Sequence, residues 1–593
     1  MKMVAAAILV ASLVGSNAYA GDPPAPAKKK QATKKPPKPT VEDQINALRQ
    51  EFQGQIDSLK SDLATKDAQL KQAQQTASDA QAAAAKAEAD ATAQQQATTE
   101  NAAAVTTLQS TVTDLKANNV SLATTVSDET SAIKKKIENP DAIYFKGITI
   151  SPTGSFIAAE TVWRQGATGG DINTQFTGIP LQYSNNAQIS EFDGTGRQSR
   201  VAIKAVGKLE KFTMTGYYEA DWLGTGITSN NNQSNSYVLR QRQLWADASL
   251  SNGWDFSGGQ GWSLATETTQ GLTRGSEILP ATIDPQYEAG FVWTRQYSFR
   301  VAKAFSNKFF LGASAENAET LNPAGSNLPT NILIGSAGNG GGLYNSTANY
   351  SYNVAPDFII KLAAEPGWGH WEIFGVNRFF RDRVYPSATS AAGAYNDSTY
   401  AGGIGGSFRG PLANKKVSIG LKGLWGQGVG RYGSSTIADI TLHPNGEIAP
   451  LRAFSALSTL EINPTPRLSI YTNYGGDYVY RGYYGKVGYG SPLTVMSGCN
   501  VEPLPGTGAV NSGDGFSPST PANCGNQTKD VQEFTAGYWY NIYAGPKGRL
   551  RYGLQYSWFE RNLWSGAGGT TNPGGGAHGA DNMFWTSFRY YLP

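Results

Sequence analysis

Hydrophobic and polar residues alternate along most of the chain, from about residue 144 to residue 593. A period of two residues is typical of β-strands, because successive side chains point to opposite faces. We distinguish sixteen alternating runs, each about long enough to cross a bilayer as a tilted strand. The runs lie at 146–164, 196–207, 210–223, 236–250, 253–265, 288–303, 307–318, 354–365, 369–382, 398–410, 414–430, 448–462, 466–481, 529–543, 548–562 and 581–592.

The segments that join these runs are alternately short and long. Lys208-Leu209 and Ser251-Asn252 are examples of the short ones. The long ones span 165–195, 224–235, 266–287, 319–353, 383–397, 431–447, 482–528 and 563–580. Outer-membrane barrels have short periplasmic turns and long extracellular loops. The pattern therefore predicts an all-β transmembrane barrel of about sixteen antiparallel strands, with both ends of the barrel in the periplasm.

The two faces of single strands agree with this prediction. In the run 210–223, one face carries Phe212, Met214, Tyr218, Ala220 and Trp222, and the other carries Thr213, Thr215, Tyr217, Glu219 and Asp221. A polar face so rich in charge cannot pack a dry core. We therefore expect the apolar face to contact lipid and the polar face to line a wet lumen.

A different period precedes the barrel. From about residue 40 to residue 139, one series of positions recurs every seven residues: Ile56, Leu63, Leu70, Ala77, Ala84, Ala91, Thr98, Val105, Val112, Asn119, Val126 and Ile133. A second series follows three residues later: Leu59, Ala73, Ala80, Ala87, Leu108, Leu115 and Leu122. A sustained heptad seam predicts a long coiled coil, because a lone helix could not bury such a stripe.

The first residues are typical of an exported protein. Lys2, the apolar stretch 4–14 and the small residues around Ala20 predict a signal peptide at 1–20. Residues 21–39 are rich in Pro and Lys and predict an extended linker. We thus divide the chain into the signal peptide, this linker, a periplasmic coiled coil at 40–139 and an outer-membrane barrel at 140–593.

Composition and charge narrow the possible functions. The mean hydropathy of -0.37 argues against a bundle of membrane helices, and a net charge of +3 gives no case for nucleic-acid binding. The two cysteines, Cys499 and Cys524, lie in the long loop 482–528. Because an exported chain enters an oxidising compartment, we expect them to form a disulfide.

The candidate site is electrostatic. Strand alternation places a group of charged residues on the lumen face, where they would face water and set pore selectivity: Arg200, Lys204, Glu219, Asp221, Arg240, Arg242, Arg300 and Arg551. Lys422 and Arg589 follow by the same argument, and Arg378 is ambiguous. The alternative is that several of these arginines only pair with Glu219 and Asp221.

The long loop after the fifth run carries Glu267, Arg274, Glu277 and Asp284. If it folds into the barrel, its charges would oppose the basic wall and create a transverse field at a constriction. An ordinary surface loop is the alternative. We interpret Trp222, Trp245, Trp558 and Tyr590 as members of an interfacial aromatic belt.

Enzymatic chemistry has little support in the sequence. The three histidines, His370, His443 and His578, lie in or next to predicted turns rather than in mid-strand. No group of residues has the spacing of a metal site. We expect no catalytic residues, no metal and no cofactor.

Several sequence blocks resemble the DcaP-like trimeric outer-membrane porins of Gram-negative bacteria. They are GITISPTGSFIAAETVW at 147–163, GRQSRVAIKAVGKLEKFTMTGYYEADWLG at 196–224, LRQRQLWADASLSNGWDFSGGQGWSL at 239–264 and the terminal WTSFRYYLP. The resemblance implies a sixteen-stranded homotrimer with a periplasmic coiled coil and a preference for small anions such as dicarboxylates.

Two function classes follow. The first is a diffusion channel for small hydrophilic solutes, embedded in outer-membrane lipid and lipopolysaccharide. The second is a structural tether or adhesin, whose coiled coil would join the outer membrane to the peptidoglycan of the cell wall.

Overall fold

A computed structural model describes the helix before the barrel and most of the barrel. The described residues are 98–138, 142–168, 172–173, 176–224, 237–283, 288–292, 294–321, 323–335, 353–413, 416–500, 502, 524–567 and 576–593. The predicted signal peptide, the predicted linker and residues 40–97 of the predicted coiled coil lie outside them.

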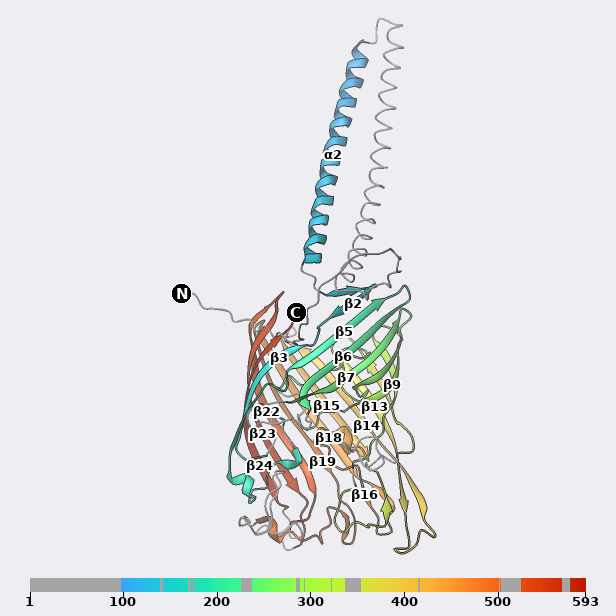
Figure 1. The fold of residues 1–593 in the computed structure, drawn as a ribbon, viewed down its shortest axis with the longest axis vertical. Coiled ribbons are helices and arrows are strands. Elements are labelled where there is room, and N and C mark those ends of the chain that lie inside the picture. The colour runs from blue at the N-terminus through green and yellow to red at the C-terminus, as the bar shows by residue number, and fades with distance from the viewer. Residues whose placement is uncertain are drawn as a thin grey trace, which may run out of the picture.

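Sixteen long strands of the described chain form a closed antiparallel barrel (Figure 1). They are β3 (Phe156–Arg164), β5 (Arg200–Lys208), β6 (Phe212–Gly224), β7 (Val238–Leu250), β8 (Trp254–Trp262), β9 (Arg295–Ala304), β10 (Phe309–Glu316), β12 (Asp357–Ala364), β13 (His370–Val384), β14 (Tyr395–Leu412), β15 (Val417–Gln427), β18 (Arg452–Thr465), β19 (Leu468–Val479), β22 (Thr528–Gly545), β23 (Gly548–Leu563) and β24 (His578–Tyr591). Each pairs with its neighbour in sequence, and β24 pairs with β3 to close the ring. The sixteen predicted strands are confirmed.

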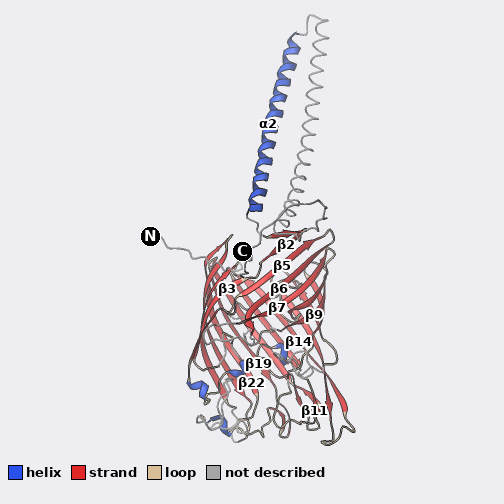
Figure 2. Cartoon of the chain, in the orientation of Figure 1, coloured by secondary structure: helices blue, strands red, loops and turns tan. Residues whose placement is uncertain are grey.

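Short strands extend or decorate this barrel. The first predicted strand is divided into β2 (Ile148–Ser151) and β3. An additional strand, β4 (Glu191–Thr195), lies in the predicted connection 165–195, just before the second predicted strand; β2 pairs with β5 and β4 pairs with β3. The other short strands are β1 (Ile143–Phe145), β11 (Ile332–Leu333), β16 (Ile440–Leu442), β17 (Ile448–Pro450), β20 (Gly482–Tyr484) and β21 (Val487–Tyr489). The strands form the wall of the barrel, the helix α2 projects from one end of it, and short helical turns lie among the loops (Figure 2).

The alternation of short and long connections is also confirmed. The short turns, such as those between β5 and β6 and between β22 and β23, lie at the same end of the barrel as the C-terminus and the helix α2 (Figure 1). The long connections lie at the opposite end. Antiparallel strands place successive connections at alternate ends of the barrel. An even number of strands places the first and last strand ends on the same side.

The outer face of the barrel is apolar, as predicted. Met214 is 44% exposed and Leu554 is 39% exposed, while the polar neighbours Glu219 and Gln555 are buried. A water-soluble barrel would show the reverse pattern. Exposed apolar side chains in this number are suited to a lipid environment.

One helix precedes the barrel. The helix α2 (Thr98–Glu138) is continuous, and Leu108, Leu115 and Leu122 of the predicted seam are half-buried. Val112 of the other seam position is 53% exposed and is available to a partner helix. None of the described helices combines the length and apolarity needed to span a membrane. The coiled coil stays a prediction.

Candidate functional site

The described residues of the loop that joins β8 to β9, 263–283, 288–292 and 294, fold into the barrel and contact its inner wall. Leu264, Ala265 and Leu272 pack in one apolar cluster with inward-facing residues of β12 and β13, including Ile359 and Phe374. Phe291 packs instead against Trp262 and Leu457. We call residues 263–294 the internal loop. Because it touches several walls, it narrows the lumen.

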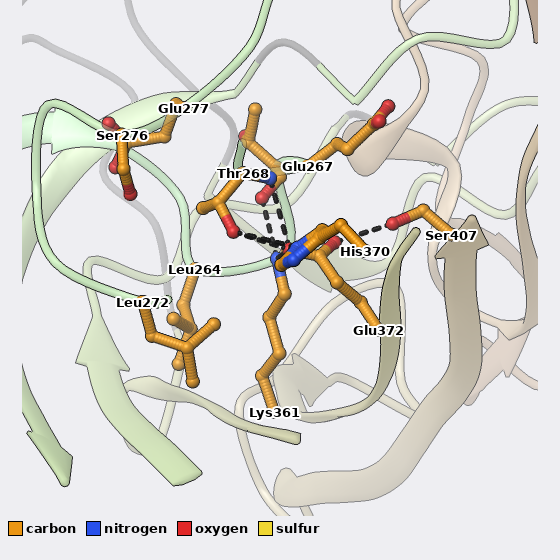
Figure 3. A network of polar contacts seen from close by, with 12 residues as sticks. Leu264, Glu267, Thr268, Leu272, Ser276, Glu277, Lys361, His370, Glu372 and Ser407 are labelled. Carbon is orange, nitrogen blue, oxygen red and sulfur yellow. Dashed lines mark hydrogen bonds and ion pairs between the residues drawn. The ribbon is translucent and has the colours of Figure 1, made fainter. Parts of the chain in front are cut away.

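A buried polar network fixes the first half of the internal loop (Figure 3). Glu372 of β13 accepts hydrogen bonds at Oε1 from Thr268 N at 3.0 Å and from Thr268 Oγ1 at 2.7 Å. The same oxygen lies 2.7 Å from Lys361 Nζ and 2.9 Å from His370 Nε2. Ser407 Oγ donates to the other carboxylate oxygen at 2.6 Å. One carboxylate therefore joins the loop to three neighbouring strands.

Three charged residues of the internal loop, Glu267, Arg274 and Glu277, have nearby partners. Glu267 pairs with Arg409 of β14 at 2.7 Å, and Glu277 pairs with Arg300 of β9 at 3.1 Å. Arg274 donates to the Ser257 hydroxyl at 3.0 Å. Burial lowers the pKa of Arg274 to about 10, so it is cationic at neutral pH.

This pairing differs from the expected transverse field. Glu267 pairs with β14, away from the wall that carries Arg200 and Arg242. Glu277 does share a cavity with Arg200 and Lys204. Asp284 lies outside the described residues. The reason for the difference is that the loop runs across the lumen instead of along one side of it.

The second half of the internal loop reaches the opposite wall. Ala281 O accepts a hydrogen bond from Trp539 Nε1 at 2.8 Å, and Ile283 N donates to Gln555 Oε1 at 2.7 Å. These partners lie on β22 and β23, across the barrel from β8 and β9. The loop thus divides the lumen.

The predicted basic wall contains compact ion pairs. Arg242 Nε lies 2.6 Å from Glu219 Oε1, and Arg242 Nη1 lies 2.8 Å from Asp221 Oδ2. Arg240 makes a bidentate contact with Asp221, at 3.0 Å and 2.8 Å. Arg200 lies 3.6 Å from Glu219. Two carboxylates therefore offset most of the charge of three arginines.

The expectation that these side chains face water is wrong for Arg242. Only 1% of Arg242 is exposed, and Glu219 and Asp221 are also buried. The physical reason is a β-bulge in β7, where the register with β6 shifts between Glu219 and Ala220. The bulge turns Arg242 and Gln243 toward the same carboxylates.

The same bulge corrects the interpretation of Trp245. Its indole is buried, lies at a tilted angle to the ring of Tyr217 with the ring centroids 5.3 Å apart, and donates to Gln243 Oε1 at 3.3 Å. Trp245 therefore lines the lumen and does not belong to an interfacial belt. After the bulge, the inward phase of β7 runs through Gln243, Trp245 and Asp247.

A cavity of about 400 Å³ lies between the bulge and the internal loop. Its basic lining residues are Arg200, Lys204 and Arg274, and its acidic ones are Glu219, Asp247 and Glu277. Lys204 is half-buried and forms no ion pair with any described residue. It is thus the cavity cation best placed to meet a solute.

The remaining candidates lie on other parts of the inner wall. Arg300 is fully buried, donates to Trp262 O at 2.8 Å and pairs with Glu277. Arg551 is half-buried, with its guanidinium 3.5 Å from the centre of the Trp539 ring. Neither faces the cavity described above.

Sequence reasoning missed several buried ion pairs. These pairs are Lys361–Glu372, Arg378–Asp439, Arg409–Glu267 and Arg589–Glu160. The strands β12 and β13 carry apolar residues on both faces, which hides the phase of the alternation for Lys361 and Arg378. In three of these pairs one partner is also far along the chain or in a loop: Asp439 and Glu267 lie in loops, and Glu160 lies on β3, so no local pattern indicates them.

The long loop between β19 and β22 is cross-linked. Cys499 and Cys524 form a disulfide with a Cα–Cα distance of 5.0 Å. Both cysteines pack in a small apolar cluster with Leu181, Met496 and Leu563. The disulfide thus closes part of this loop on itself, and the apolar cluster packs the closed segment against neighbouring residues.

Comparison with known proteins identifies the fold. No protein-family model matches the chain. No curated protein sequence matches it. The outer membrane channel DcaP of Acinetobacter baumannii matches the structure with a TM-score of 0.50 and 13% sequence identity, over 76% of this chain and 99% of that chain.

Two further solved structures match less closely. The anion-selective porin from Comamonas acidovorans has a TM-score of 0.37 and 10% identity, covering 75% of this chain and 99% of its own. Salmonella typhi OmpF in complex with daunomycin has a TM-score of 0.38 and 11% identity, covering 76% and 99%. The match to DcaP shows that the chain has the fold of an outer-membrane channel barrel.

Proposed function

We propose that the protein is an outer-membrane channel that passes small hydrophilic solutes through a narrowed lumen. The observation that carries this proposal is a closed barrel with an apolar outer face, whose lumen is divided by the internal loop and retains a polar cavity. Charged groups on both sides of that cavity suit the passage of water-soluble molecules.

We further propose a moderate preference for small anions, with dicarboxylates as the first candidates. Lys204 supports this preference, because it lines the cavity without an ion pair to any described residue. Arg200 adds to it, since its contact with Glu219 is long at 3.6 Å. Arg240 and Arg242 contribute less, because Asp221 and Glu219 balance their charge.

The test is the reversal potential of single channels in a planar bilayer under a salt gradient. We expect anion selectivity in the wild type, and a shift toward cations in Lys204→Gln. The effect should weaken at high salt, since the Debye length falls from about 10 Å at 0.1 M to 3 Å at 1 M.

Lys308→Gln is the matched control, because Lys308 is exposed in the short turn between β9 and β10 and does not line the cavity. It should leave the reversal potential unchanged. A cation-selective wild type, or identical potentials in Lys204→Gln and the wild type, would refute the anion preference but not the channel.

The proposed assembly is a homotrimer in outer-membrane lipid and lipopolysaccharide. The heptad seam of α2 supports it, since its leucines recur every seven residues and Val112 is exposed. The coiled coil would lie in the periplasm, on the side of the short turns.

A structural tether or adhesin is the second candidate. One observation favours it: the internal loop and its ion pairs bury many inward-facing side chains, including Arg300 and Lys361. A barrel filled in this way could be closed, with α2 reaching toward peptidoglycan. Absence of any conductance in bilayers, with correctly folded protein, would decide for the tether.

A further inference from the structure

Two arginines of β23, Arg549 and Arg551, lie on the inner face of the barrel near its short-turn end. Gln555 is buried on that inner face, and strand alternation puts Arg551 and Arg549 on the same face. The internal loop meets this strand at Gln555, which accepts a hydrogen bond from Ile283 N. The two arginines therefore lie between the internal loop and the end of the barrel that carries α2.

Aromatic rings alternate with these two guanidinium groups. Arg551 Cζ lies 3.5 Å from the centre of the Trp539 ring and 5.3 Å from the centre of the Tyr591 ring. Arg549 Cζ lies 4.5 Å from the centre of the same Tyr591 ring. Arginine side chains stack on aromatic faces, and such contacts are attractive. The rings thus hold both groups in place without accepting their hydrogen bonds.

Neither guanidinium group has an acceptor for its hydrogen bonds in the described part of the chain. Arg549 and Arg551 form no ion pair there, and Arg551 Nε is buried without a hydrogen-bond partner. The ionisable groups that act most strongly on Arg551 are Tyr591, Arg589, Arg549 and Tyr471. None of them is a carboxylate, so the neighbours of Arg551 do not neutralise it.

A third arginine increases the positive charge of this wall. Arg589 of β24 is the direct neighbour of Arg551 in the sheet, and it pairs with Glu160 at 2.6 Å. Among the described residues, three guanidinium groups thus share one carboxylate. Like charges repel each other more strongly in a protein wall than in bulk water. An anion from the lumen would relieve this repulsion.

We propose that Arg549 and Arg551 form a binding site for small dicarboxylates between the internal loop and the short-turn end of the lumen. Each guanidinium group presents its N–H donors in a planar fork that matches one carboxylate. Two forks beside one tyrosine ring suit a solute that carries two carboxylates. We call Arg549 and Arg551 the paired-arginine site.

The paired-arginine site is distinct from the cavity that Lys204 lines, because neither of its arginines belongs to the cavity lining. The inference rests on the proposed function, a channel that prefers small anions, and adds a second place where the solute binds. A solute that leaves the cavity toward the short-turn end would meet it next.

The test is saturation-transfer NMR of the full-length protein in detergent with succinate as the probe, at pH 7 and low ionic strength. We expect the wild type to bind succinate more tightly than acetate by about tenfold, because acetate fills only one fork. In Arg549→Gln and in Arg551→Gln, the affinity for succinate should fall about tenfold, to that for acetate.

Two further variants make the test specific. Arg467→Gln is the matched control, because Arg467 is exposed in the short turn between β18 and β19, and it should bind succinate like the wild type. Arg551→Lys keeps the charge but removes the planar fork, so it should lose most of the affinity that Arg551→Gln loses. Binding by Arg551→Lys at the wild-type level would contradict recognition by paired forks.

Two other results would overturn the site. One is equal affinity for succinate in the wild type, Arg549→Gln and Arg551→Gln, and the other is equal affinity of the wild type for succinate and acetate. If Arg551→Gln does not fold, Arg549→Gln decides, because Arg549 is exposed. The binding assay needs no conductance. A conducting channel without succinate binding would refute only the site, whereas a barrel that binds succinate but never conducts would refute the channel.

Discussion

Arg242 donates to two carboxylates at once, and its own side chain is almost completely buried. Replacing it by alanine would leave Glu219 and Asp221 close together without their main counter-charge. We expect Arg242→Ala to lower the free energy of unfolding by about 3 to 5 kcal/mol, as for other broken buried pairs. Urea denaturation in lipid vesicles, followed by tryptophan fluorescence, measures this change.

Lys204→Ala provides the comparison for this prediction. Lys204 faces the cavity without an ion pair to a described residue, so its removal should change the free energy of unfolding by less than about 0.5 kcal/mol. If both variants had the same stability, the ion pairs of the bulge would not contribute to folding.

Glu288 leads to a prediction about the pH dependence of stability. Burial and the neighbouring Glu533 carboxylate raise its pKa in the folded protein, while in the unfolded chain it is about 4.3. An acid with a raised folded pKa destabilises the fold as pH rises above the unfolded value. The stability of the wild type relative to Glu288→Gln should therefore fall from pH 4 upward in denaturation at a series of pH values. A constant difference would show that Glu288 does not ionise on unfolding.

At the scale of elements, the internal loop is fixed by contacts that can be removed one at a time. Thr268→Val removes the hydroxyl bond to Glu372, which contributes about 1 kcal/mol. We expect the loop to leave the wall roughly fivefold more often, which would appear as more frequent conductance steps in single-channel records.

Thr269→Val is the control for this change. Thr269 is the adjacent residue, and its hydroxyl bonds only within the loop, to Ser276 O at 3.1 Å. The channel records of Thr269→Val should match those of the wild type. Equal step frequencies in both variants would mean that the Glu372 network does not restrain the loop.

The disulfide acts on another element, the loop between β19 and β22. It joins two residues with a sequence separation of 25. Because it restricts the unfolded chain, it should stabilise the folded state by about 3 kcal/mol. We expect Cys499→Ser with Cys524→Ser to make this loop sensitive to protease, while the barrel keeps its resistance to unfolding in detergent gels. Mass spectrometry of the cleaved chain locates the cuts.

The strands could be predicted from the sequence because their period of two residues is set by local geometry. The path of the internal loop could not, because the contacts of Thr268 and Ala289 are to residues far along the chain. The ion pairs of Arg242 could not be predicted either, because they depend on a bulge in β7. A single extra residue in β7 reverses the phase, and no alternation pattern indicates where it lies.

At the scale of the whole molecule, we expect a trimer held by two sets of contacts. Deleting residues 40–138 should weaken the trimer without dissolving it, because the barrels would keep contacts of their own. Light scattering in mild detergent measures both forms. A monomeric full-length chain would contradict the proposed coiled coil, and a monomeric deletion variant would show that the barrels do not associate.

The seam between β3 and β24 has a consequence for biogenesis. Thr161 and Thr586 meet there at 2.7 Å although they are 425 residues apart, and Glu160 and Arg589 form an ion pair across the same seam. A chain that stops before β24 would leave the edges of β3 and β23 with unpaired backbone groups, which lipid cannot solvate. No partial barrel can then persist in the membrane. Insertion must therefore follow synthesis of the last strand, because the 14 residues of β24 close the barrel by pairing with β3.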